Sequence, residues 1–159
     1  MKIVAFFSLS FLLLSCQDDT SCCINIDVGV DFMVKSEDGA DLLNPASPDA
    51  FSEDDIWLYY LTDGEPERYY KGNLDAAKGF SIYPDESLDA HVIRVFPNTA
   101  ESEEFPVTYI QWDEEGNNID TLRCEFQRTE NSLICTRVWF NGELKRSPTI
   151  TKMVFEVIK

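Results

Sequence analysis

Apolar and polar side chains alternate over residues 24–34, and this alternation constrains the fold more than any other feature of the sequence. One face of the segment carries Asn25, Asp27, Gly29 and Asp31, and Met33 is its only apolar member. The opposite face is apolar throughout: Ile24, Ile26, Val28, Val30, Phe32 and Val34. Successive side chains of a strand point to opposite faces. The segment therefore predicts a half-buried strand of the antiparallel type.

The rest of the chain reads as further short strands separated by turns. Asp63-Gly64 and several prolines and asparagines supply the turn signals, and only residues 74–78 suggest a helical turn. The other predicted strands are 56–61, 68–71, 80–83, 91–96, 107–112, 117–127, 133–141 and 151–158. Many short strands of this kind predict an all-β fold, an antiparallel β-sandwich of Ig-like or prealbumin-like type. An eight-stranded β-barrel is the alternative. We expect one domain over residues 22–159.

One predicted hairpin can be given a register. A three-residue loop at 129–131 would pair Arg128 with Ser132 and place the last loop residue, an asparagine, in the left-handed region. That register sets Leu122 opposite Val138 and joins the apolar faces of the two strands.

The N-terminus predicts export and lipidation. Lys2 precedes an apolar run, residues 3–14, which as a helix would span about 18 Å, less than the roughly 30 Å of a hydrocarbon core. Residues 1–15 are therefore predicted to be a cleaved signal peptide. The run ends in Leu13-Leu14-Ser15-Cys16, which resembles a bacterial lipobox. The resemblance implies that Cys16 becomes the first residue and carries several acyl chains such as palmitate, enough for stable anchoring.

Residues 16–21 form an acidic tether after the lipidation site. Gln17 stands where an inner-membrane retention signal would have aspartate, and Asp18 and Asp19 resemble the surface-export signal of Bacteroidota lipoproteins. We expect an outer-membrane location with exposure at the cell surface. A periplasm-facing position is the alternative.

The cysteine count allows disulfides, because an exported chain meets oxidising conditions. Cys22, Cys23, Cys124 and Cys135 remain after lipidation and permit three complete pairings. In the predicted register Cys124 and Cys135 lie on opposite faces of the hairpin and cannot bond without a slip. A Cys22–Cys124 bridge and a vicinal Cys22–Cys23 bond are the alternatives.

Charge and composition exclude several functions. The formal net charge is −16, and loss of residues 1–15 with Lys2 takes it to −17, which opposes nucleic-acid binding. The sequence contains no GxSxG, GxGxxG, Walker-type or HExxH motif. His91, the single histidine, lies in a predicted strand and is expected to be structural or exposed. We therefore predict no catalytic residues, no metal site and no cofactor.

Aromatic residues supply the candidate binding surface. Trp57, Tyr59, Tyr69, Tyr70 and Trp139 belong to predicted strands, where an outward row could stack on sugar rings or anchor a protein partner. The alternative is packing in the core or between neighbouring strands.

Several segments together carry a family resemblance: Cys22-Cys23, DGADLLNP at 38–45, IWLYYLTDG at 56–64 and VWFNGEL at 138–144. With the lipobox, they are similar to a group of small Bacteroidota lipoproteins of flavobacterial type. The resemblance implies a β-rich extracytoplasmic domain and assigns it no activity or catalytic residues. The strand–turn–loop order also resembles prealbumin-like and carboxypeptidase-regulatory-like sandwiches, which favours a sandwich over a barrel.

These observations lead to one functional hypothesis and two alternatives. The hypothesis is a surface-exposed outer-membrane lipoprotein whose non-enzymatic β-sandwich binds an envelope protein or a glycan. The alternatives are a carboxylate-based glycan hydrolase, suggested by the acid-rich loops, and a structural subunit of an envelope complex.

Overall fold

A computed structural model describes residues 24–113, 115, 117–150 and 153–159. The predicted signal peptide, the tether, the lipidation site Cys16, the sorting residues and the pair Cys22-Cys23 lie outside the described residues. Over the described part the chain forms eleven strands and no helix, which confirms the all-β prediction. No helix there offers the length and hydrophobicity needed to cross a membrane.

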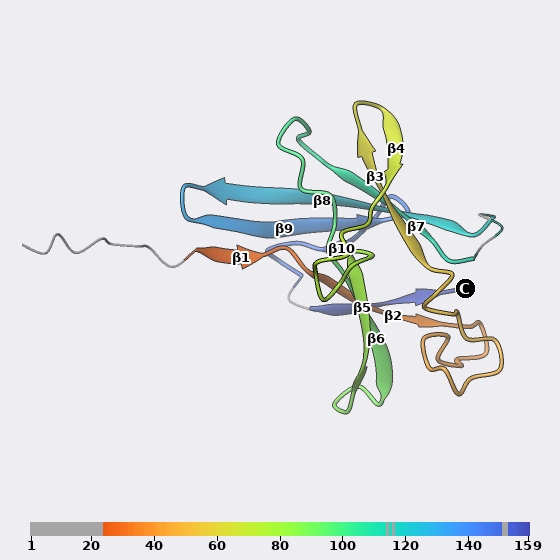
Figure 1. Cartoon of the computed structure of the whole chain (residues 1–159). Helices are drawn as coiled ribbons and strands as arrows, with labels where there is room; N and C mark the ends of the chain where they lie inside the picture. The colour runs from red at the N-terminus through yellow and green to blue at the C-terminus, as the bar shows by residue number, and fades with distance from the viewer. Residues whose placement is uncertain (1–23, 114, 116, 151–152) are drawn as a thin grey trace, which may run out of the picture.

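Seven strands form the larger sheet (Figure 1). Their order across the sheet is β1-β9-β8-β7-β3-β4. The seventh strand, β10, pairs with the C-terminal part of β9, whereas β1 pairs with its N-terminal part. The strands are β1 (Asn25–Asp27), β3 (Trp57–Thr62), β4 (Glu65–Arg68), β7 (Val107–Gln111), β8 (Ile119–Thr129), β9 (Ser132–Phe140) and β10 (Glu143–Arg146).

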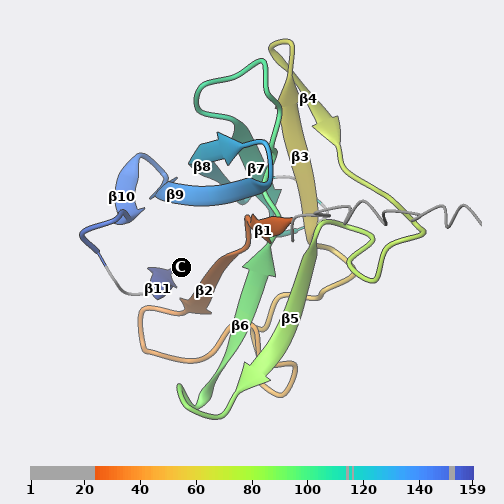
Figure 2. The ribbon, with the colours of Figure 1, turned by 90° about the vertical axis from the view of Figure 1, so that its left-hand side faces the viewer.

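Four strands form the smaller sheet, in the order β11-β2-β6-β5. They are β2 (Val30–Lys35), β5 (Phe80–Asp85), β6 (Ala90–Val95) and β11 (Val154–Ile158). Figure 2 shows this sheet below the larger one as a separate layer. The two sheets do not close into a barrel, so the sandwich prediction is confirmed and the eight-stranded barrel is wrong.

The sheets are mixed rather than purely antiparallel. β1 runs parallel to β9, and β11 runs parallel to β2. The remaining pairs are antiparallel. Both parallel pairs join segments far apart in the chain, as parallel neighbours require long connections.

The alternating segment 24–34 is not one strand. It is interrupted at Val28-Gly29, where the chain passes from β1 in the larger sheet to β2 in the smaller one. Ile26 is 64% exposed in β1, whereas Phe32 is fully buried in β2. The prediction of a single strand is therefore wrong. Alternation specifies which side chains share a face, but it does not specify which sheet the strand joins.

The core fills the space between the inner faces of the two sheets. Phe32 lies at its centre, with ring centroids 5.2 Å from Phe155, 5.3 Å from Phe140 and 6.3 Å from Trp112. Aliphatic residues of both sheets, such as Ile93 and Leu122, complete one continuous cluster. Interdigitation of two inner faces in this way is what stabilises a β-sandwich.

Two of the tight turns follow the sequence signals closely. Asp63-Gly64 joins β3 to β4, and Asn141-Gly142 joins β9 to β10, each with both residues at positive φ. Such two-residue hairpin turns favour Asn or Asp followed by Gly. Residues 72–79, by contrast, form turns and bends and do not contain the suggested helical turn.

The β8–β9 hairpin differs from the predicted register. Its loop has two residues, so Thr129 pairs with Ser132, and a bulge between Glu125 and Phe126 adds a second shift. Leu122 therefore pairs with Phe140 instead of Val138. A one-residue slip exchanges the faces of a strand. The prediction that Cys124 and Cys135 lie on opposite faces is consequently wrong, because the structure buries both.

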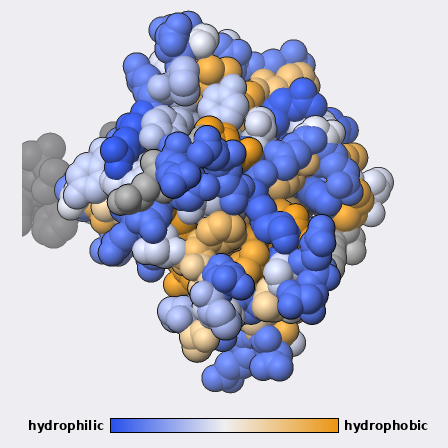
Figure 3. Space-filling view, turned by 90° about the vertical axis from the view of Figure 1, so that its right-hand side faces the viewer, coloured by the Kyte–Doolittle hydropathy of each residue, from blue (hydrophilic) through white to orange (hydrophobic). Residues whose placement is uncertain are grey.

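The sequence contains 29 acidic and 13 basic side chains, most of which are expected to be exposed. Figure 3 shows one face on which hydrophilic residues predominate and hydrophobic residues form scattered patches.

Candidate functional site

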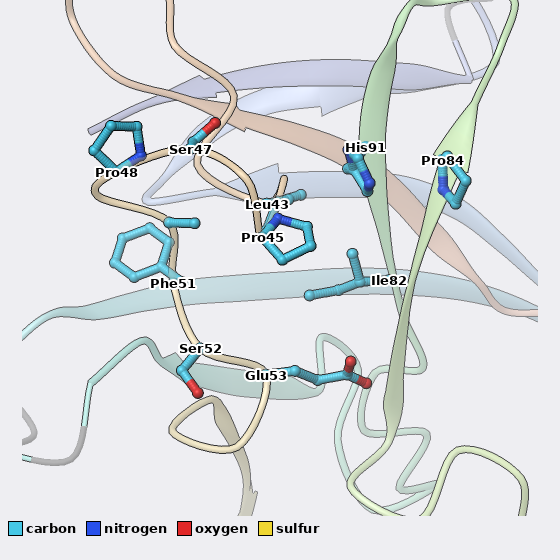
Figure 4. Close-up of a pocket in the computed structure, with 11 residues that line it drawn as sticks. Leu43, Pro45, Ser47, Pro48, Phe51, Ser52, Glu53, Ile82, Pro84 and His91 are labelled. Carbon is cyan, nitrogen blue, oxygen red and sulfur yellow. The ribbon is translucent and has the colours of Figure 1, made fainter.

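A hollow of about 600 Å³ lies between the loop that follows β2 and the β5–β6 hairpin (Figure 4). Leu43, Pro45, Phe51, Ile82 and Pro84 are among its apolar lining residues. Its polar lining consists of Ser47, Ser52, Glu53 and His91. Polar and apolar atoms contribute about equally to the lining, and the volume is within the range of small-ligand sites.

Local hydrogen bonds hold the loop that forms one wall of the hollow. Asp41 Oδ1 accepts a hydrogen bond from the backbone N–H of Leu43 at 3.0 Å, and Asn44 Oδ1 accepts one from Ala46 at 2.9 Å. The N–H of Phe51 donates to the carbonyl of Leu42 at 2.9 Å and closes the loop. The wall is therefore preformed in the unliganded chain.

His91 is fixed at the other wall by Asp41. Asp41 Oδ2 accepts a hydrogen bond from the backbone N–H of His91 at 2.8 Å and lies 3.0 Å from its Nδ1. Burial tends to raise the pKa of the Asp41 carboxyl, but hydrogen bonds from His91 and Leu43 outweigh it and lower that pKa. Asp41 is thus a carboxylate at neutral pH and accepts a hydrogen bond from Nδ1–H of His91. The second ring nitrogen, Nε2, is then left for other partners.

The sequence did not reveal this pair. It placed His91 correctly in a strand, but the partner carboxylate is 50 positions away along the chain. Asp41 belongs to the DGADLLNP segment, which the family resemblance singled out without assigning it a role. Only the approach of that loop to β6 brings the two residues together.

A smaller hollow of about 210 Å³ adjoins the first and shares Pro84 and His91 with it. Its rim is acidic, with Asp85 and Asp89 among its lining residues. Hydrogen bonds from the Ser87 hydroxyl and from backbone N–H groups lower the pKa of Asp85. The Asp85 carboxylate beside the main hollow therefore carries negative charge at neutral pH and disfavours anionic ligands.

The predicted binding aromatics are only partly gathered on one surface. Trp57 and Tyr59 of β3 and Trp139 of β9 alternate with buried neighbours, so they share the outer face of the larger sheet. Tyr70 is exposed, with its ring centroid 6.4 Å from that of Trp57. Tyr69 instead packs against the core, with its ring centroid 4.5 Å from that of Tyr60.

Cationic side chains already contact the rings of this outer face. The Arg68 guanidinium lies 3.1 Å and the Lys78 ammonium 4.2 Å from the ring centroid of Trp57. The Arg123 guanidinium lies 4.7 Å from the centroid of Trp139. Cation–π contacts of this kind stabilise the sheet surface and compete with a sugar for the ring faces. The hollow beside His91 is therefore the stronger candidate for ligand binding.

The structure places two of the four candidate disulfide residues. Cys124 and Cys135 are buried as free thiols on the inner face of β8 and β9. The proposed pairings with Cys22 and Cys23 stay predictions, since both lie outside the described residues. Within the described part of the chain, no group of three or more His, Cys, Asp or Glu side chains is arranged to hold a metal ion.

Comparison with protein-family models, curated proteins and solved structures gave no match.

Proposed function

We propose that this protein is a surface-exposed lipoprotein of the outer membrane, anchored through Cys16, whose β-sandwich binds a neutral glycan without cleaving it. The observation that carries the binding proposal is the preformed hollow of about 600 Å³ with His91 fixed at its wall by Asp41. The lipobox and the acidic tether with Asp18 and Asp19 support the location.

The lining of the hollow suits a carbohydrate. His91 Nε2 and the Glu53 carboxylate can accept hydrogen bonds from sugar hydroxyls, and the Ser47 and Ser52 hydroxyls can both donate and accept. Phe51 and the neighbouring prolines offer apolar surface to the C–H face of a sugar ring. The acidic rim disfavours phosphorylated or uronic sugars, so the ligand class is a neutral glycan.

The location can be tested by protease treatment of intact cells. We expect the wild-type protein to be digested, and a double variant, Asp18→Ala with Asp19→Ala, to be protected. Cys16→Ala removes the anchor and serves as the control for lipidation. Protection of the wild type in intact cells, with digestion only after lysis, would overturn the surface assignment.

The binding proposal can be tested by titrating the detergent-solubilised full-length protein with neutral envelope polysaccharides. His91→Gln should weaken binding about tenfold, the equivalent of one hydrogen bond to the ligand. Tyr59→Ala, on the outer face of the larger sheet, is the matched control and should leave binding unchanged. The reverse pattern would move the binding surface to the outer aromatic row.

The hydrolase alternative has less support. Glycosidases use two carboxyl groups about 5–10 Å apart, one with a raised pKa that allows it to act as an acid. The main hollow has one lining carboxylate, Glu53, and the neighbouring Asp41 and Asp85 have lowered pKa values. Release of reducing ends from a bound glycan, abolished by Glu53→Gln, would favour hydrolysis over binding.

The structural-subunit alternative rests on the outer face of the larger sheet. Trp57 and Trp139 with their covering arginines could contact another protein, because Trp and Arg are common anchors of interfaces. Constant co-purification with one larger envelope complex, lost in Trp139→Ala, would favour this alternative.

A further inference from the structure

The bulged β8–β9 register brings two thiols together inside the sandwich. Cys124 pairs with Val138 and Cys135 pairs with Phe126, so the cysteines are diagonal neighbours across the bulge. Cys124 is fully buried and Cys135 is 6% exposed. Both side chains therefore belong to the same buried core cluster between the sheets.

Only one of the two thiols reaches the surface. Cys135 lines an open hollow of about 370 Å³ together with Asp27, Arg146 and Ser147. Cys124 does not belong to that lining and lies behind Cys135. A reagent that enters from solvent therefore meets Cys135 first.

A buried cation lies beside the accessible thiol. Arg146 is 8% exposed and donates through Nη2 to the carbonyl of Cys135 at 3.0 Å and through Nη1 to the carbonyl of Gly29 at 3.2 Å. Its Nε is buried and has no hydrogen-bond partner. The guanidinium thus keeps an unused donor while it is bound to the backbone of Cys135. An adjacent guanidinium favours the thiolate, which is the nucleophilic form of cysteine.

The protonation of the pair follows this arrangement. The hydrogen bond from Cys124 lowers the pKa of the Cys135 thiol, and the Arg146 charge acts in the same direction. Burial and the charge of Asp27 oppose them without reversing the shift. The same hydrogen bond, together with burial, raises the pKa of the Cys124 thiol. Cys135 is the better nucleophile and Cys124 is the proton donor to it.

We infer that Cys135 and Cys124 form a disulfide by exchange with an external disulfide that enters the hollow beside Arg146. The Cys135 thiolate attacks one sulfur of the external disulfide, which forms a mixed disulfide and releases the other sulfur as a thiolate. Cys124 then loses its proton and attacks the Cys135 sulfur, which expels the second external thiolate. Two protein thiols are oxidised, the external disulfide is reduced to two thiols, and the protons from the cysteines pass to those thiols.

The bond requires a modest local movement. The sulfurs must approach from hydrogen-bonding distance to about 2.05 Å. The bulge beside Phe126 is the point where the strands can adjust, since its extra residue is outside the regular ladder. A bond between Cys124 and Cys135 excludes the alternative Cys22–Cys124 bridge.

Peptide mapping can test the inference directly. The reduced full-length protein would be treated with oxidised glutathione, alkylated and digested with trypsin without reduction. Cleavage after Arg123, Arg128 and Arg137 places the two cysteines in separate peptides, 124–128 and 129–137. We expect these peptides to be joined, with a mass two hydrogen atoms below their sum. Cys135 recovered alkylated, with Cys124 unlinked, would overturn the inference.

Single variants test the order of attack. In Cys124→Ser the mixed disulfide with glutathione should accumulate on Cys135, because no second thiol resolves it. In Cys135→Ser, Cys124 should stay free of glutathione in the folded protein. Glutathione on Cys124 in that variant would contradict the order.

The pH dependence of Cys135 alkylation tests the role of Arg146. In a Cys124→Ser background, Arg146→Gln should slow the alkylation of Cys135 at pH 7 about tenfold and shift the pH profile upward, because loss of the cation raises the pKa of the thiol. An unchanged pH profile would show that Arg146 only supports the strand. Far-UV circular dichroism of the variant would confirm that it is folded.

Discussion

Two aspartates of the sandwich, Asp120 and Asp41, each hold a cluster of polar side chains. The Asp120 cluster is enclosed, whereas the Asp41 cluster borders a hollow. Asp120 accepts hydrogen bonds from Trp112 Nε1 at 2.7 Å and Asn141 Nδ2 at 2.8 Å, and it lies 2.6 Å from Lys159 Nζ. Asp120 is 5% exposed, so this cluster is enclosed. It ties the end of β11 to the start of β8 across the two sheets.

The Asp41–His91 cluster has the same kind of bonds but an open side. Asp41 is held by backbone and ring N–H groups, whereas the His91 ring keeps Nε2 at the wall of a hollow. The comparison shows that a buried carboxylate does not identify a functional site by itself. A polar group whose hydrogen-bonding capacity is fully used stabilises the fold, and one with capacity left at a cavity can bind.

Asp120→Ala should have the largest effect on stability. The substitution leaves the Lys159 ammonium and the Trp112 and Asn141 donors without their shared acceptor. Breaking a buried ion pair typically lowers the free energy of unfolding by about 3–5 kcal/mol. Urea unfolding followed by tryptophan fluorescence measures the loss. The exposed Asp75→Ala is the control and should change stability by less than about 0.5 kcal/mol. A loss for Asp120→Ala as small as the control's would break the comparison.

Tyr60→Phe should have an intermediate effect and a signature at high pH. The Tyr60 hydroxyl donates to the carbonyl of Phe96 at 2.6 Å, and its removal should cost about 1–2 kcal/mol. Burial, with a smaller contribution from Tyr69, raises the pKa of Tyr60 well above its ordinary value of 10.0. The folded state therefore favours the neutral phenol, so its stabilisation is complete below pH 10 and falls as the pH rises further.

The measurement is the free energy of unfolding of both proteins between pH 8 and pH 11.5. The wild-type stability should decline above about pH 10, and Tyr60→Phe should decline less steeply. Tyr69→Phe serves as the matched control on the neighbouring ring. If the stability of the wild type and of Tyr60→Phe fell in parallel with pH, then the buried Tyr60 phenol would not cause the loss of stability at high pH.

Asp41→Asn should destabilise the protein less, by about 0.5–1.5 kcal/mol at neutral pH, because the amide oxygen can still accept one hydrogen bond. The lowered pKa of Asp41 means that the carboxylate stabilises the folded state above the ordinary value of 3.8, and that this contribution is lost as the pH falls further. Unfolding measured from pH 2.5 to 7 should show a flatter acid limb in the variant. An equally steep acid limb would show that other carboxylates control acid unfolding.

The fold was largely readable from the sequence because its signals are local. Period-two alternation located most strands, and the Asp63-Gly64 dipeptide fixed a turn whose backbone needs positive φ. The passage of the chain between sheets at Gly29 was not readable, because alternation is the same in either sheet. The β8–β9 register failed for a related reason: a two-residue loop and a bulge exchange the faces without altering the pattern.

The candidate site was less accessible to sequence reasoning. The histidine was noticed, but its carboxylate partner and the hollow depend on the packing of a loop against a distant strand. The prediction of an outward-facing aromatic row was partly correct, since Trp57 and Trp139 lie on the outer face of the larger sheet. What the sequence could not supply was the arginine and lysine contacts to those rings, which depend on tertiary proximity.

His91→Gln should have the smallest effect on stability, and it tests the comparison most sharply. The backbone N–H of residue 91 continues to donate to Asp41, and the glutamine amide can replace the ring N–H as a donor. We expect the free energy of unfolding to change by less than about 0.5 kcal/mol, whereas glycan binding weakens. The enclosed cluster should show the opposite behaviour, since Asp120→Ala unfolds the protein more easily and leaves the hollow intact in the folded fraction. If His91→Gln destabilised the protein as strongly as Asp120→Ala, then the open side of the His91 cluster would have no separate function, and both clusters would serve only to hold the sandwich together.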